Sequence, residues 1–333
     1  MRHILPSRFH RLAMSIIFAS LVLCLAVPLF AQTCNPPKQV RTGIVLHTPV
    51  FVARVVVRDK KGKDVRDLKG SDFVILADGK PENTLFLHSL EPTDSTCTGI
   101  IIDRSGSREH VFPNGEFAPI ENYVVSNVDS NHGVFLVALN DQAIPVGGFL
   151  TNSAELNQEL ARARSIGPLG TTARNDAIEL AARELANARG YRILVIVTEG
   201  DDNHSKSTSN EAIDAALRVG AAVYFIELSP DSSDRETPEG ISEFTSFAER
   251  ITEETGGEVL YVRKKYDFDT AFAVIKEDFA NTYLIGFSPS ELRKKTEFHK
   301  LKVRTKEKDL KVIAPSRFYW PNQSPALTRN REK

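Results

Sequence analysis

The sequence predicts an α/β protein: a doubly wound, mostly parallel sheet flanked by helices, with a small β-sandwich formed from N- and C-terminal strands. From residue 100 onward, short apolar runs alternate with amphipathic helical segments, which is typical of strands covered by helices on both faces. Before and after this region, the pattern is of strands alone. Each flank is small for an independent domain, so we expect the two to form one sandwich split by the α/β domain.

The apolar runs of the α/β region are expected to be buried strands, and Ile193–Val197 is the most apolar of them. The segment 144–150 is predicted to be an antiparallel neighbour of 134–139. Helices are expected where apolar residues recur three and four positions apart, as in 173–188. The predicted strands are 100–102, 134–139, 144–150, 193–197, 222–226 and 257–262, and the predicted helices are 154–165, 173–188, 210–218, 241–255 and 268–279.

The flanking strands are expected at 50–57, 73–76, 85–87, 282–287, 298–305 and 310–314, with a hairpin turn at Asp78-Gly79. In Lys300–Arg304, basic residues alternate with leucine and valine. We interpret this as a solvated strand face, because no aromatic residues interleave with the basic ones and acidic residues lie nearby. The net charge of -1 also gives no case for nucleic-acid binding.

The N-terminus has the pattern of a secretory signal peptide over residues 1–31. Three arginines without an acidic residue precede an uncharged apolar segment, Leu12–Ala31. We therefore expect an exported protein, periplasmic or extracellular. The apolar segment is long for a signal peptide, so an uncleaved N-terminal membrane anchor stays open as the alternative, and membrane association is expected only in that case.

Domain boundaries follow from these patterns: a β-rich part at 36–93, the α/β domain at 96–280, closing strands at 281–319 and a disordered tail at 321–333.

Cleavage of the signal segment would leave two cysteines, Cys34 and Cys97. In an oxidising compartment they would be able to form one disulfide, while two free thiols are the alternative.

The strongest chemical motif directly follows the first α/β strand. Asp103, Ser105 and Ser107 stand at alternate positions, and Gly106 between the hydroxyls permits a tight turn. Open α/β sheets bind ligands at the carboxyl ends of their strands. Carboxylate and hydroxyl oxygens suit a small hard cation such as Mg²⁺. By itself the motif is also compatible with a simple turn stabilised by its own side chains.

Two further loops are predicted at the carboxyl ends of strands, carry oxygen donors and are expected on the same rim. Gly170-Thr171-Thr172-Ala173 opens the helix that contains Asp176, and Thr198-Glu199-Gly200 leaves the strand at 193–197. Asp176 is expected to stabilise the first turn of its helix rather than to contact metal.

With these three loops, the α/β region resembles a von Willebrand factor type A (VWA) domain, and most closely the exported acidobacterial VWFA-related group. The resemblance extends to Leu68–Phe73 and Asp78–Pro81 before the domain and to Thr282–Pro289 after it. It implies a metal-ion-dependent adhesion site with Asp103, Ser105, Ser107, Thr172 and Glu199 as metal ligands. Glu199 departs from the family's aspartate, and Thr171 stands where the family has a second glycine.

The resemblance and the donor chemistry together imply a binding protein rather than an enzyme. A bound Mg²⁺ or Mn²⁺ with at most two carboxylates would keep its attraction for an acidic side chain of a partner protein. A Mg²⁺-dependent hydrolase or phosphotransferase is the first alternative, with His204 as the only nearby base. A structural envelope protein with a degenerate metal site is the second, suggested by Glu199 and Thr171.

Overall fold

The computed structural model describes residues 49–109, 114–228, 243–264, 267–290, 292 and 297–321. The predicted signal segment, Cys34 and all of the predicted tail except Pro321 lie outside these residues. Cys97 is disulfide-bonded, and its pairing with Cys34 stays a prediction. Among the helices that the structure describes, none has the length and the apolar character needed to cross a bilayer.

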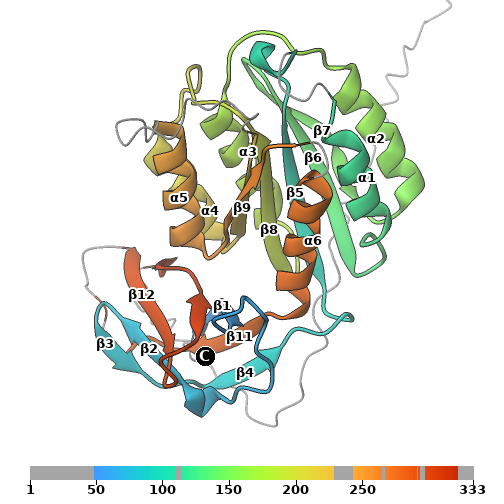
Figure 1. Cartoon of the computed structure of the whole chain (residues 1–333). Helices are drawn as coiled ribbons and strands as arrows, with labels where there is room; N and C mark the ends of the chain where they lie inside the picture. The colour runs from blue at the N-terminus through green and yellow to red at the C-terminus, as the bar shows by residue number, and fades with distance from the viewer. Residues whose placement is uncertain are drawn as a thin grey trace, which may run out of the picture. The chain divides into compact units, whose positions relative to one another are not determined.

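A six-stranded sheet forms the centre of the α/β domain, in the spatial order β10-β9-β8-β5-β6-β7 (Figure 1). The strands from β10 to β6 are parallel to their neighbours, and β7 is the antiparallel edge strand. The predicted mostly parallel sheet is therefore confirmed. Its strands are β5 (Thr96–Asp103), β6 (His132–Leu139), β7 (Ala143–Leu150), β8 (Tyr191–Thr198), β9 (Ala222–Leu228) and β10 (Val259–Val262).

Helices cover both faces of this sheet, as its unbroken apolar strands require. Ile100 and Ile102 of β5 belong to a core with three of the helices, whereas Ile101 belongs to the core of the opposite face. The first face carries α1 (Phe117–Val125), α2 (Ser153–Ser165) and α6 (Asp267–Ala280), and the second carries α3 (Arg174–Ala186), α4 (Ser209–Val219) and α5 (Glu243–Thr255).

Strands from the two flanks combine into two four-stranded sheets, ordered β13-β1-β11-β4 and β14-β12-β2-β3. Both sheets contain N-terminal and C-terminal strands, and their inner faces share one apolar core. The split β-sandwich is therefore confirmed as part of the fold class. Its strands are β1 (Phe51–Arg58), β2 (Phe73–Ala77), β3 (Lys80–Glu82), β4 (Phe86–Ser89), β11 (Tyr283–Phe287), β12 (Phe298–Thr305), β13 (Lys311–Ile313) and β14 (Arg317–Tyr319).

Four short elements, β3, β4, α1 and β14, differ from the sequence-based expectation. The second strand of the hairpin after β2 is β3, which has three residues and pairs with β2. The strand expected at 85–87 is β4, which pairs with β11 in the other sheet of the sandwich. Helix α1 and strand β14 were not expected. Helix α1 is short and has Pro119 in its first turn, so its stability comes from burying Phe117, Ile120 and Val124.

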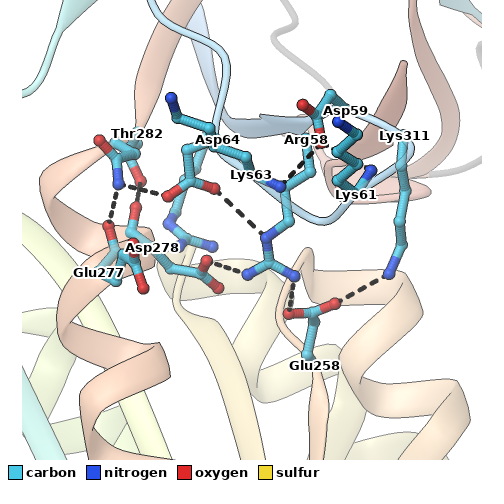
Figure 2. A network of polar contacts seen from close by, with 12 residues as sticks. Arg58, Asp59, Lys61, Lys63, Asp64, Glu258, Glu277, Asp278, Thr282 and Lys311 are labelled. Atoms are coloured by element: carbon cyan, nitrogen blue, oxygen red, sulfur yellow. Dashed lines mark hydrogen bonds and ion pairs between the residues drawn. The ribbon is translucent and has the colours of Figure 1, made fainter. Parts of the chain in front are cut away.

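A polar network joins the sandwich to the α/β domain (Figure 2). Arg58, at the end of β1, donates to Glu258 at 2.7 Å and to Asp278 of α6. Lys311 of β13 reaches the other oxygen of Glu258 at 3.1 Å. The hydroxyl of Tyr224 in β9 donates to Asp278 at 2.9 Å. Since the Asp278 side chain is only 1% exposed, its charge depends on these partners.

Candidate metal centre

Asp103 lies at the carboxyl end of β5 with no exposed surface. Its Oδ1 accepts a hydrogen bond of 2.8 Å from the amide of Ser105, and its Oδ2 accepts one of 2.5 Å from the hydroxyl of Thr198. Each carboxylate oxygen is therefore fixed by one donor and keeps a further lone pair. Because β8 pairs with β5 in parallel, the strand pairing itself brings Thr198 beside Asp103.

The two predicted hydroxyl ligands of the first loop lie together. The Oγ atoms of Ser105 and Ser107 are 3.4 Å apart, with Ser105 buried and Ser107 exposed. Gly106 allows a second loop to approach: its amide donates to the carbonyl of Gly170 at 3.1 Å, and an added Cβ would lie 3.2 Å from that carbonyl oxygen. The first loop is thus compact and open on the Ser107 side.

The second loop, 166–173, corrects one expectation, because it joins α2 to α3 and does not follow a strand. It reaches the rim through hydrogen bonds. The amide of Leu169 donates to the carbonyl of Arg104 at 3.1 Å, and that of Ala173 donates to the carbonyl of Asn140 at 2.7 Å. Thr172 is 4% exposed, whereas Thr171 is exposed. Of the two threonines, Thr172 is the one held among the loops.

The third loop, after β8, is bonded to the second. The amides of Asn203 and His204 donate to the carbonyl of Thr172 at 3.1 and 3.2 Å, and the side chain of Asn203 accepts from the amide of Thr172 at 2.8 Å. A Cβ added at Gly200 would lie 3.7 Å from the Thr172 hydroxyl. Thr172 therefore adjoins the third loop, and Asp103 adjoins Thr198, the residue from which that loop begins.

Three further residues organise this rim: Thr198 and Asp202, for which the sequence pattern predicts no role, and Asp176, which it predicts to stabilise the first turn of its helix. Thr198 was identified only as part of its loop, although a hydroxyl ending an apolar strand is a local signal. Asp202 accepts from the amide of Asn175 at 2.7 Å. Asp176 lies in the first turn of α3 and accepts from the amides of Ser207 at 2.9 Å and Lys206 at 3.1 Å. The third loop is thereby bonded to the start of α3.

Glu199, the fifth predicted ligand, lies next to a buried arginine. Its Oε2 is 3.8 Å from Nη1 of Arg108, and the two side chains are 7% and 1% exposed. Arg108 also donates to Glu116 at 2.8 Å, and Arg104 lies 3.4 Å from the other oxygen of Glu116. Burial raises the pKa of Glu116, and Arg108 opposes that shift. Burial lowers the pKa of Arg104, and the nearby charge of Glu116 opposes that shift.

The donor set fits a small hard cation better than a soft one. Within the described ranges, no group of three or more histidine, cysteine, aspartate or glutamate side chains is arranged to hold a metal. A metal at this rim would instead rely on hydroxyl oxygens beside a carboxylate, which are donors for Mg²⁺ or Mn²⁺. Four of the predicted ligands fit that chemistry: Asp103, Ser105, Ser107 and Thr172. The fifth, Glu199, forms an ion pair with Arg108.

No family model matches the chain, and no curated protein matches it. Among solved structures, an aerotolerance-related membrane protein from Bacteroides fragilis is 20% identical, with 56% of this chain and 98% of that chain covered and a TM-score of 0.42. A von Willebrand factor type A protein from Catenulispora acidiphila is 11% identical, with coverages of 84% and 76% and a TM-score of 0.40.

A third similar structure is proximal thread matrix protein 1 from the mussel byssus, with a zinc-occupied MIDAS motif. It is 15% identical with a TM-score of 0.46, and 60% of this chain matches 48% of that chain. Identities this low concern the fold alone. In this chain's own structure, five parallel strands in the order β10-β9-β8-β5-β6 carry an antiparallel edge strand β7, and the Asp103–Ser107 turn follows β5. The α/β portion of this chain is therefore a doubly wound, mostly parallel α/β domain with helices on both faces of its sheet.

Proposed function

We propose that this protein is an exported binding protein whose VWA-type domain recognises a partner protein through a divalent cation. In this proposal, Asp103, Ser105, Ser107 and Thr172 hold Mg²⁺ or Mn²⁺, and Glu199 contributes charge to the same site. The partner supplies an acidic side chain to the ion. The role is one of binding, not of catalysis.

The observation that carries this proposal is the convergence of the loops around Asp103. Its two oxygens are fixed by Ser105 and Thr198, and the hydroxyls of Ser105 and Ser107 are 3.4 Å apart. Mg²⁺ takes about six oxygens at about 2.1 Å. Preorganised neutral hydroxyls and one buried carboxylate leave such an ion strongly attractive to another anionic oxygen. An acidic side chain from a partner meets that requirement.

The enzyme alternative has less support from the geometry. His204 is exposed, and the bond that places it at the rim is made by its backbone amide, which donates to the carbonyl of Thr172. A general base has to be held within hydrogen-bond reach of the proton that it removes. An exposed histidine ring on a loop gives no such positioning, so the binding role is preferred.

A thermal-shift titration of the full chain with Mn²⁺ tests the metal site. A ligand that binds only the folded state stabilises it by about 2.7 kcal/mol at a hundred times its Kd, so the melting temperature should rise for the unmodified protein. The rise should disappear in Asp103→Ala. Ser107→Ala, at an exposed position, should reduce it without affecting the fold.

Asp309→Asn is the matched control, because it removes an exposed carboxylate from the sandwich and should leave the Mn²⁺ shift unchanged. A melting temperature that does not respond to millimolar Mn²⁺ or Mg²⁺ in the unmodified protein would contradict the proposal. That result would favour a structural envelope protein with a degenerate site.

A further inference from the structure

We infer that Arg108 is the affinity-determining residue of the proposed metal site: its guanidinium competes with the divalent cation for Glu199. The inference rests on the proposed function, since it concerns the same ion. Under this inference, the Arg108 guanidinium is a positive charge built into the site. The protein should therefore bind a divalent metal more weakly than the same oxygen donors would without Arg108.

Arg108 is buried beside Glu199, close enough to compete with a metal ion for the carboxylate of that residue. The residue belongs to the turn that supplies Ser105 and Ser107, and it is 1% exposed. One side of its guanidinium donates to Glu116 at 2.8 Å, and Nη1 lies 3.8 Å from Oε2 of Glu199. A buried guanidinium is poorly screened by water and salt. Glu199 therefore already has a cation beside it when no metal is bound.

Arg108 changes the charge balance of the cluster that it forms with Asp103, Arg104, Glu116 and Glu199. Asp103, Glu116 and Glu199 provide three carboxylates, and Arg104 and Arg108 provide two guanidinium groups. The formal total is therefore -1, and a divalent cation would bring it to +1. Without Arg108 the same cluster would carry -2 before metal binding, and 0 after it. Arg108 thus weakens cation binding and makes this cluster of side chains net positive once a cation is bound, which favours an acidic ligand.

A structural role for Arg108, as the partner of Glu116 alone, predicts something different. Glu116 has no exposed surface, and leaving its charge unpaired would be costly. In that case, replacing Arg108 would affect folding stability but would not change metal affinity in a way that depends on Glu199. Dependence on Glu199 therefore separates competition from simple charge pairing.

The test is a double-mutant cycle with the Mn²⁺ dissociation constant as its readout, measured by calorimetry on the full chain. Arg108→Gln, Glu199→Gln and the double variant are compared with the unmodified protein. We expect Arg108→Gln to tighten Mn²⁺ binding about tenfold when Glu199 is present, through removal of one nearby positive charge. In the Glu199→Gln background the same substitution should have a clearly smaller effect. Because Arg108→Gln leaves Glu116 with Arg104 alone, Arg108→Gln/Glu116→Gln serves as a second, charge-balanced variant.

The outcomes distinguish this inference from the proposed function. Equal or weaker Mn²⁺ binding in Arg108→Gln and in the charge-balanced variant overturns the inference, while Asp103-dependent binding by the unmodified protein leaves the proposed function intact. Binding that appears only when Arg108 is replaced supports the inference, but contradicts metal-dependent recognition by the unmodified chain. An equal tightening with and without Glu199 also overturns the inference. Absence of Mn²⁺ binding in every variant overturns both.

Discussion

At the scale of single residues, the site depends on how a fully buried carboxylate is held. Asp103 has no exposed surface, and water cannot replace a missing hydrogen bond there. Its two donors come from different parts of the chain: the amide of Ser105, two residues away, and the hydroxyl of Thr198 on the neighbouring strand. Thr198 is therefore a positioning residue for the proposed metal ligand.

Replacement of Thr198 by valine, which has nearly the same shape, should destabilise the protein by about 1–3 kcal/mol, because a buried oxygen of Asp103 loses its donor. Urea denaturation measures this change in the free energy of unfolding. Thr252→Val is the matched control. The Thr252 hydroxyl is also buried, but it donates only to carbonyls of its own helix at 2.8 and 3.0 Å, so a smaller loss is expected. Equal losses in the two variants would contradict the role of Thr198.

At the scale of elements, the start of α3 and the third loop behave as one unit. Asp176 in the first turn of α3 accepts from the amides of Ser207 and Lys206, and Asp202 accepts from the amide of Asn175. These bonds tie the loop that carries Glu199 to the helix that follows Thr172. Two of the three rim loops are therefore fixed by side chains that need not contact a metal.

The link through Asp176 should depend on pH. Burial opposes its charged form, but the amides of Ser207 and Lys206 outweigh this and lower the pKa of Asp176 from its ordinary value of 3.8. A carboxyl whose folded-state pKa is lowered stabilises the fold above its unfolded-state pKa, and that contribution is lost as the pH falls through the folded-state value. Asp176→Asn should therefore cost about 1 kcal/mol at neutral pH, and the cost should shrink below about pH 4.

Urea denaturation of the metal-free protein at several pH values checks this expectation. Asp201→Asn is the control, because Asp201 lies exposed in the same loop, and its replacement should have little effect at any pH. A cost of Asp176→Asn that does not change between neutral and acidic pH would show that the ionised carboxylate does not stabilise the loop.

At the scale of the whole molecule, the inserted α/β domain is joined to the sandwich by charge as well as by the chain. Arg58 of β1 donates to Glu258 and to Asp278 of α6 (Figure 2). Burial raises the pKa of Asp278, and the arginines Arg54 and Arg58 oppose that shift. A buried carboxylate of this kind is tolerated only while its cationic and hydroxyl partners are present.

Arg58→Met should therefore destabilise the protein by about 3–5 kcal/mol, since it removes one partner of a buried ion pair. Arg58→Met/Asp278→Asn should recover part of this loss, because the remaining charge is removed as well. The free energies of unfolding come from urea denaturation. Lys60→Met, which breaks an exposed pair with Asp309, should cost less than about 1 kcal/mol. If Arg58→Met cost no more than this control, the network would not hold the two parts together.

Local sequence patterns were sufficient for most strands, most helices and the first loop of the site. The strands of the central sheet are recognisable because both of their faces are buried, which makes runs such as Ile193–Val197 apolar throughout. Asp103, Ser105 and Ser107 stand within five consecutive residues, so their common turn follows from local geometry. Helix α1 and strand β14 were missed because both are short and are stabilised mainly by their neighbours.

Only the tertiary structure decided how the remaining site residues meet. The loop 166–173 follows a helix and reaches the rim through bonds to Arg104, Gly106 and Asn140, and no periodicity of the sequence encodes those contacts. The sequence by itself determined that Glu199 would follow the strand β8, but not that Arg108 would lie 3.8 Å from it. The strength of a hydrogen bond or an ion pair depends on the distance between the two groups in the folded protein. For residues far apart in the sequence, that distance is set only when β5 pairs with β8 and the helices pack against the sheet.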